Sequence, residues 1–179
     1  MAQQVHNSLG KTEMWYVLNS QPNSYLYCGF NEPLSIDNYD DLVHNGTIID
    51  KLNKIYTKPG DTIYVPAGRI HAIGAGNLIV EIQETSDITY RVFDYNRKDA
   101  NGNYRELHTE FARQALNFND CNVTVEQYDS TIENKLINLV SSPMFSTNII
   151  NLSEETEIDT RKLDSFMTAI VLEGGCNIT

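Results

Sequence analysis

The chain has 179 residues, enough for one domain with a hydrophobic core, and 41% of them are hydrophobic, which argues against a disordered protein. Its formal net charge of −11 disfavours nucleic acid and anionic membrane surfaces as partners, and an anionic ligand would need positive side chains gathered at its site. No apolar run is long enough to cross a bilayer, and the first residues lack a basic-then-apolar signal pattern, so we expect a cytoplasmic protein.

The three cysteines, Cys28, Cys121 and Cys176, are widely spaced and form no CxxC pair. This pattern predicts reduced thiols in the core or on the surface. It argues against a disulfide framework and against a zinc site built from thiolates.

The first part of the chain predicts two strands followed by helices. Apolar and aromatic runs predict strands at 14–18 and 25–29. Between 35 and 54 the apolar residues recur at helical spacing, and Asn45–Gly46 interrupts them. We therefore expect a helical insertion of two short helices there, with Ser35 as the first N-cap.

The middle of the chain predicts mostly strands. β-branched and aromatic runs bounded by turn residues indicate strands at 63–65, 78–82 and 89–93, and Asp99–Asn103 (DANGN) predicts a turn. Residues 108–116 predict a helix with Phe111 and Ala115 on its buried side.

The last part of the chain returns to strand-like runs at 122–125 and 132–179, and the final FMTAIVLEGGCNIT predicts an unfinished hairpin. Short strands with Gly and Pro turns favour a mainly β jelly-roll or sandwich. We expect a core at 1–117 that carries the helical insertion, and a C-terminal β segment at 118–179 that is incomplete.

One histidine stands at a turn that the sequence defines closely. In GDTIYVPAGRIH, Pro66 fixes φ, Gly68 permits a backbone conformation that other residues resist, and His71 begins the next strand. Such a rigid junction suits a metal ligand, because the ring is positioned before the metal arrives. From the residues alone, a hydrogen-bonded core histidine is the favoured interpretation.

The spacing G-x5-P-x-G-x2-H, from Gly60 to His71, resembles a motif of the cupins. Cupins are small jelly-roll β-barrels that hold one metal ion with histidines and a carboxylate. This resemblance implies a cupin-like barrel with His71 as a ligand.

Three stretches together resemble the type I phosphomannose isomerases. They are GKTEMWYVL from Gly10, PAGRIHAIGAG from Pro66 and EIQETSDITYRVFDYNR from Glu81, and the similarity continues through NGNYRELHTE. The resemblance implies a Zn²⁺-dependent enzyme that interconverts mannose 6-phosphate and fructose 6-phosphate.

The resemblance also implies roles for individual residues. Glu13 and His71 match zinc ligands, Arg91 matches an active-site arginine that steadies negative charge, and Lys11 matches a lysine beside the metal. Asp87 is expected to orient Arg91. Without the resemblance, Glu13 and Lys11 read as surface groups and Arg91 as a salt-bridge partner of Asp87 or Asp94. The catalytic base stays open among a carboxylate, zinc-bound water or hydroxide, and a histidine.

The start of the chain departs from the family pattern. The family draws two further zinc ligands from a Q-V-H-P motif, whereas this chain has Gln4-Val5-His6-Asn7, only six residues before Glu13. Gln4 and His6 therefore match the ligand pair poorly, and two ligands alone would hold zinc weakly. Missing front strands would leave an exposed sheet edge, through which we expect a homodimer.

Three functions remain open at this point. The first is the sugar-phosphate isomerase. The second is a truncated, noncatalytic cupin-like module that binds a sugar phosphate or a partner. A metal-dependent cupin oxygenase is disfavoured, because no H-x-H pair accompanies the motif.

Overall fold

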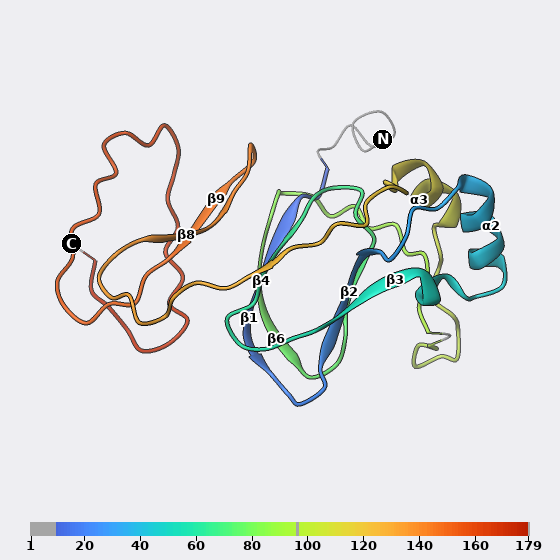
Figure 1. The fold of residues 1–179 in the computed structure, drawn as a ribbon, viewed down its shortest axis with the longest axis horizontal. Helices are drawn as coiled ribbons and strands as arrows, with labels where there is room; N and C mark the ends of the chain where they lie inside the picture. The colour runs from blue at the N-terminus through green and yellow to red at the C-terminus, as the bar shows by residue number, and fades with distance from the viewer. Residues whose placement is uncertain (1–9, 96, 179) are drawn as a thin grey trace.

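The structure, a computed structural model, describes residues 10–95 and 97–178 (Figure 1). Its regular elements are β1 (Glu13–Ser20), β2 (Tyr25–Phe30), α2 (Ile36–His44), the 3-10 helix η1 (Ile48–Lys51), β3 (Leu52–Tyr56), β4 (Thr62–Val65), β5 (His71–Ile73), β6 (Asn77–Gln83), α3 (Thr109–Ala115), β7 (Val125–Glu126), β8 (Ile137–Ser141) and β9 (Ser146–Ile149). The mainly β prediction is confirmed. None of the helices in the described part of the chain is long and apolar enough to span a membrane.

Two antiparallel sheets enclose the main core. One has the strand order β6-β1-β4-β7 and the other β3-β2-β5. Because side chains alternate along a strand, every second residue of β1 points between the sheets. The buried residues of this core are Trp15, Leu26, Cys28, Ile63 and Val65. The strands β3, β5, β6 and β7 end the two sheets, and the homodimer expected through such an edge stays a prediction.

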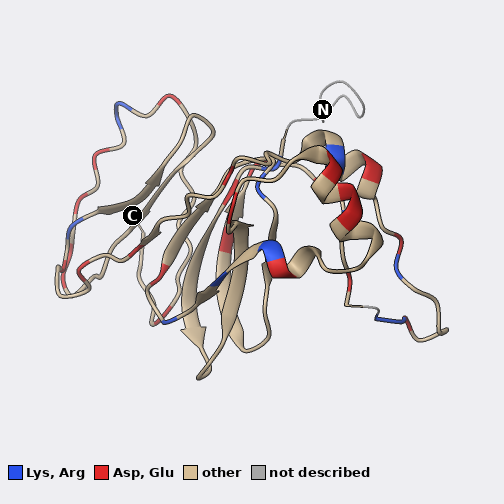
Figure 2. Cartoon of the chain, turned by 45° about the vertical axis from the view of Figure 1, so that its right-hand side comes forward, with Lys and Arg blue, Asp and Glu red and all other residues tan. Residues whose placement is uncertain are grey.

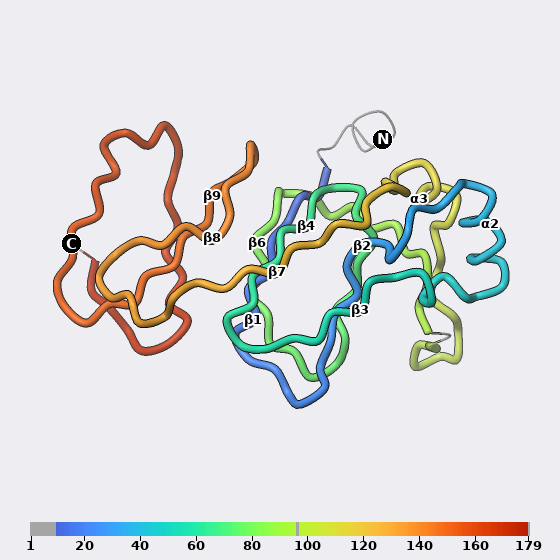
Figure 3. The backbone as a smooth tube through the Cα atoms, viewed as in Figure 1, coloured from blue at the N-terminus to red at the C-terminus, as the bar shows by residue number. Residues whose placement is uncertain are grey.

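The opposite face of the larger sheet is also covered. Met14 and Tyr16 of β1 pack there with Val140 of β8, in a second apolar cluster that includes residues of β9. After α3 the chain runs back along β4, pairs with it as β7, and continues into the β8–β9 hairpin (Figure 3). β1 is therefore covered on both faces, which fixes the strand that carries Glu13.

The helical insertion forms, but it ends at Lys51, and the predicted helical residues 52–54 belong to strand β3. The Ser35 side chain accepts a hydrogen bond of 3.1 Å from the Asn38 amide and so caps α2, and Gly46, at φ +71°, separates α2 from η1. Tyr39 is buried and packs beside Phe118 of the loop that follows α3. Acidic positions mark this helical end, whereas the strands are largely uncharged (Figure 2).

Two strand predictions are wrong. Residues 89–93 form no strand, because the Arg91 backbone bonds to His108 rather than to a neighbouring strand, while Val92 and Phe93 pack against the helical cluster. Residues 150–178 also contain no strand. An apolar run becomes a strand only where a partner backbone is in register, and the final run exposes 88% of Phe166 instead.

The helix predicted at 108–116 forms as α3, but the prediction of its buried side is wrong. Ala112 is buried, whereas Phe111 is 41% exposed and stacks on Tyr90 with ring centroids 5.5 Å apart. A helix that begins at Thr109 turns Ala112 toward the core. The predicted division at residue 117 stays a prediction, and the chain after it contributes Phe118 to the helical cluster and β7 to the larger sheet.

Substituting two glycines should lower the free energy of unfolding by different amounts. Gly68 lies in the turn between β4 and β5, and Gly46 lies between α2 and η1. Gly68 has φ +90°, and a Cβ there would lie 2.9 Å from the Ala115 carbonyl oxygen, whereas Gly46 has φ +71° with nothing within 4 Å. Gly46→Ala should cost only the left-handed backbone penalty, about 1–2 kcal/mol. Gly68→Ala should cost more, because the clash adds to that penalty. Urea unfolding of both variants tests this, and equal costs would contradict it.

Candidate active site

The two residues expected to bind a metal face one another. Glu13 begins β1 on the same side as Trp15 and is 0% exposed, and His71 begins β5 opposite Cys28 of β2. The Glu13 Oε1 atom lies 3.1 Å from His71 Nε2. The two sheets therefore bring together side chains that lie 58 residues apart in the sequence.

The ring of His71 is held on two sides. Its Nδ1 lies 2.8 Å from the Arg69 carbonyl oxygen, and the ring meets Trp15 edge-on at a centroid distance of 5.2 Å. Nδ1 therefore faces the Arg69 carbonyl and Nε2 faces Glu13, so each ring nitrogen lies opposite an oxygen that can only accept a hydrogen bond.

Lys11 neutralises the other oxygen of Glu13. Its Nζ donates to Glu13 Oε2 at 2.5 Å and to Glu81 Oε1 at 3.2 Å. Partial burial lowers the pKa of the Lys11 ammonium, but the hydrogen bonds and charges of Glu13 and Glu81 outweigh it and raise that pKa above its usual value. Lys11 is therefore charged at neutral pH and belongs to this group of side chains.

Glu81 is a member of the site that the sequence analysis missed. It lies on β6 directly beside Trp15 of β1 and accepts a hydrogen bond of 3.2 Å from the Trp15 indole nitrogen. A usable signal was present, because Glu81 is a charged residue in the middle of the otherwise apolar run NLIVEIQ.

The Glu13–His71 pair fits part of a metal site. Glu13 Oε1 is buried and accepts no hydrogen bond from any described residue, so two lone pairs face each other unless a proton or a metal ion lies between them. Two ligands of one tetrahedral ion, each about 2.0–2.2 Å from it, stand about 3.3–3.5 Å apart, close to the distance found here.

The described residues supply no complete ligand set. Between 10 and 95 and between 97 and 178, no three His, Cys, Asp or Glu side chains group in a way that could hold a metal ion. Burial raises the pKa of the neighbouring Cys28 thiol to about 11, so this thiol is not a thiolate ligand at neutral pH. Gln4 and His6 lie outside the described residues.

Arg91 lies in the segment between β6 and α3. Its Nη1 donates to the Glu106 carbonyl at 3.1 Å, and its Nε is 4.0 Å from Asp94 Oδ1. Within the described residues Arg91 forms no ion pair with Asp87, which was expected to orient it, and no hydrogen bond joins it to Glu13 or His71. The carboxylate beside Arg91 is therefore that of Asp94.

Asp94 gathers two further arginines. Arg97 Nη2 lies 2.5 Å and Arg105 Nη1 3.4 Å from its Oδ1. The hydrogen bond from Arg97, with the charges of Arg105 and Arg91, holds the pKa of Asp94 below its usual value. Three guanidinium groups around one carboxylate concentrate positive charge in an otherwise acidic chain.

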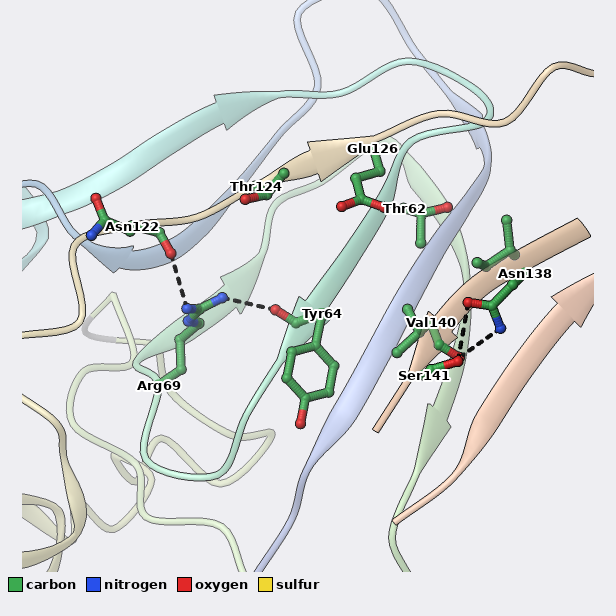
Figure 4. A pocket seen from close by; sticks show the side chains of 10 residues that line it. Thr62, Tyr64, Arg69, Asn122, Thr124, Glu126, Asn138, Val140 and Ser141 are labelled. Carbon is green, nitrogen blue, oxygen red and sulfur yellow. Dashed lines mark hydrogen bonds between the residues drawn. The ribbon is translucent and has the colours of Figure 1, made fainter. Parts of the chain in front are cut away.

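A separate hollow of about 420 Å³ lies between the larger sheet and the β8–β9 hairpin (Figure 4). Thr62, Tyr64, Arg69 and Glu126 line one side of it, and Asn138 and Ser141 line the other. Neither Glu13 nor His71 lines it. We place the candidate site at the Glu13–His71 pair, because reactive groups converge there and not in the hollow.

The Lys11–Glu13 pair predicts a stability difference between two ion pairs. Lys11→Met leaves a carboxylate that is 1% exposed without its cation and should lower the free energy of unfolding by about 3 kcal/mol. Lys51→Met breaks the exposed pair with Glu32 and should cost less than about 1 kcal/mol. Chemical denaturation measures both, and a Lys11→Met cost as small as that of the control would contradict the prediction.

Sequence and structure comparisons relate the chain to known proteins. No family model matches the chain. Mannose-6-phosphate isomerase ManA of Bacillus subtilis is 34% identical over 170 residues, which is 94% of this chain and 53% of that protein. The mannose-6-phosphate isomerase of Streptococcus mutans is 34% identical over 96% of this chain and 53% of its own length.

The fold has a solved counterpart as well. The crystal structure of the mannose 6-phosphate isomerase from Bacillus subtilis matches with a TM-score of 0.66 and 34% identity, covering 81% of this chain and 46% of that one. The resemblance to the phosphomannose isomerases is therefore confirmed: the chain is homologous to them over nearly its whole length, and it spans about half the length of the curated relatives it matches.

Proposed function

We propose that this chain carries the metal-binding part of a zinc-dependent aldose–ketose isomerase that interconverts mannose 6-phosphate and fructose 6-phosphate. The observation that carries the proposal is the buried Glu13 Oε1, which lies 3.1 Å from His71 Nε2 and accepts no hydrogen bond from any described residue. Homology to proteins named mannose-6-phosphate isomerase supports the reaction and the substrate.

Glu13 and His71 would hold the zinc ion in this proposal. Carboxylate oxygen and neutral imidazole nitrogen are both donors that zinc accepts, and a catalytic zinc takes three protein ligands. Gln4 and His6 stay predictions for the remaining positions. When bound, zinc polarises the sugar carbonyl and stabilises the negative charge that develops on its oxygen.

The protein side chains around the pair have separate tasks. Lys11 holds Glu13 Oε2, which leaves Oε1 directed at the metal position, and it places a positive charge beside the reacting sugar. Arg91 is assigned to the charge that develops on the substrate, since a guanidinium is always protonated. Arg97 and Arg105, which also pair with Asp94, add positive charge near Arg91, and this charge favours an anionic substrate.

A second function fits one specific observation. The described residues supply two metal ligands, Glu13 and His71, whereas a catalytic zinc takes three. A noncatalytic, cupin-like module that binds a sugar phosphate is therefore the alternative. Zinc content and turnover of mannose 6-phosphate, measured on the same preparation, separate the two functions.

The ligand assignment predicts which histidine matters for zinc. His71→Ala should lower the zinc affinity by at least ~10–100-fold, because it removes one of the assigned ligands. His44→Ala changes an exposed histidine at the end of α2 and should leave the affinity unchanged. Competition with a zinc-chelating dye measures both variants. Equal affinity of His71→Ala and the unaltered chain would remove His71 from the site.

The role of Arg91 predicts a loss of rate. Arg91→Ala should lower the turnover of mannose 6-phosphate by about 10²–10³-fold, the effect of removing one group that stabilises an oxyanion. Arg161→Ala removes an exposed arginine that pairs with Asp159 and should leave turnover unchanged. A coupled assay for fructose 6-phosphate gives both rates. Unchanged turnover in Arg91→Ala would exclude Arg91 from the reaction.

A further inference from the structure

Arg69 is anchored at four points. Its Nε and Nη2 donate to the Asp120 carboxylate at 2.5 and 2.7 Å. Its Nη1 donates to the Tyr64 carbonyl at 2.8 Å, and Nη2 also donates to the Asn122 carbonyl at 3.1 Å (Figure 4). The side chains of Arg69 and Asp120 are only 9% and 13% exposed. Two hydrogen bonds between one guanidinium and one mostly buried carboxylate constrain the orientation of the Arg69 side chain as well as its position.

These bonds leave the guanidinium little capacity for a ligand. Arginine has five N–H groups, and four of them are used here. Although Arg69 lines the hollow beside the β8–β9 hairpin, its donors are directed at the protein itself. The guanidinium therefore acts on the turn that carries it.

The backbone of the same residue orients His71. The Arg69 carbonyl oxygen lies 2.8 Å from His71 Nδ1, and Nε2 is directed at Glu13. A hydrogen bond to one ring nitrogen sets which nitrogen carries the proton and therefore which one is free to bind a metal. The Arg69 carbonyl thus holds Nδ1 and leaves Nε2 directed at Glu13.

The loop after α3 holds this turn from a second side. The Asn117 amide donates to the Gly68 carbonyl at 2.9 Å, and the Asp120 carbonyl accepts from the Phe30 amide at 3.0 Å. Asp120 therefore joins the turn of residues 66–69 to β2 as well as to its own loop.

We propose that Arg69 and Asp120 form a positioning pair that fixes the Arg69 carbonyl, so that this carbonyl holds His71 Nδ1 and keeps Nε2 directed at Glu13. The metal-binding consequence rests on the proposed function, whereas the control of the ring does not. Asp120 acts through Arg69, and no hydrogen bond joins its side chain to His71.

The test compares the orientation of the His71 ring and the zinc affinity in the full 179-residue chain. A crystal structure of the metal-free chain should show Nδ1 hydrogen-bonded to the Arg69 carbonyl and Nε2 directed at Glu13. Asp120→Asn and Arg69→Lys, which both lose the two-point pair, should break the hydrogen bond to Nδ1 and lower zinc affinity by about 10–100-fold. Asp40→Asn breaks the exposed pair with Arg113, whose Nε lies 3.0 Å from Asp40, and should change neither quantity.

The outcomes are distinct. If folded Asp120→Asn and Arg69→Lys keep the hydrogen bond between His71 Nδ1 and the Arg69 carbonyl, the positioning role is wrong, whatever their stability. If that hydrogen bond is lost but neither the variants nor the unaltered chain binds zinc, the positioning role stands and the proposed function fails. If Asp120→Asn does not fold, Asp120→Glu, which keeps the charges and lengthens one side chain, gives the same comparison.

Discussion

The burial of the Glu13 carboxylate is the constraint on which the site depends. An ionised group removed from water has to be paired and hydrogen-bonded, or it destabilises the fold. Lys11 meets that need at Oε2, and the orientation of His71 leaves Oε1 without a hydrogen-bond donor among the described residues. The structure therefore directs one buried oxygen of the Glu13 carboxylate at His71 Nε2.

The rest of the fold keeps these two groups in place. β1 is paired on both edges, with β4 and with β6, and packed on both faces, so Glu13 has little freedom to move. His71 lies on the short edge strand β5, which has less support of its own. The turn of residues 66–69 and the loop that contains Asp120 compensate, because they attach the start of β5 to the core. Rigid elements of this kind are what a site needs to hold its geometry.

Local patterns predicted a good part of this arrangement. The spacing of Pro66, Gly68 and His71 predicted the strand–turn–strand unit, and Ser35 predicted the start of α2, because both depend on neighbouring residues alone. The failures are long-range. A strand at 89–93 needs a partner that the sequence does not name, and the Arg69–Asp120 pair spans 51 residues. Glu81 became part of the site only when β6 paired with β1.

The energetic cost of burying the Glu13 carboxylate also bears on function. A buried ion pair is often no more stabilising than apolar residues of the same size, so stability alone does not explain a glutamate at an inward position of β1. Trp15 and Val17, the next inward residues of the strand, show that this face otherwise accepts apolar side chains. Positions that break the local pattern at a cost to the fold are where functional sites are expected. In this strand Glu13 is that position. Lys11 donates to its Oε2 and also to Glu81, and His71 faces its Oε1.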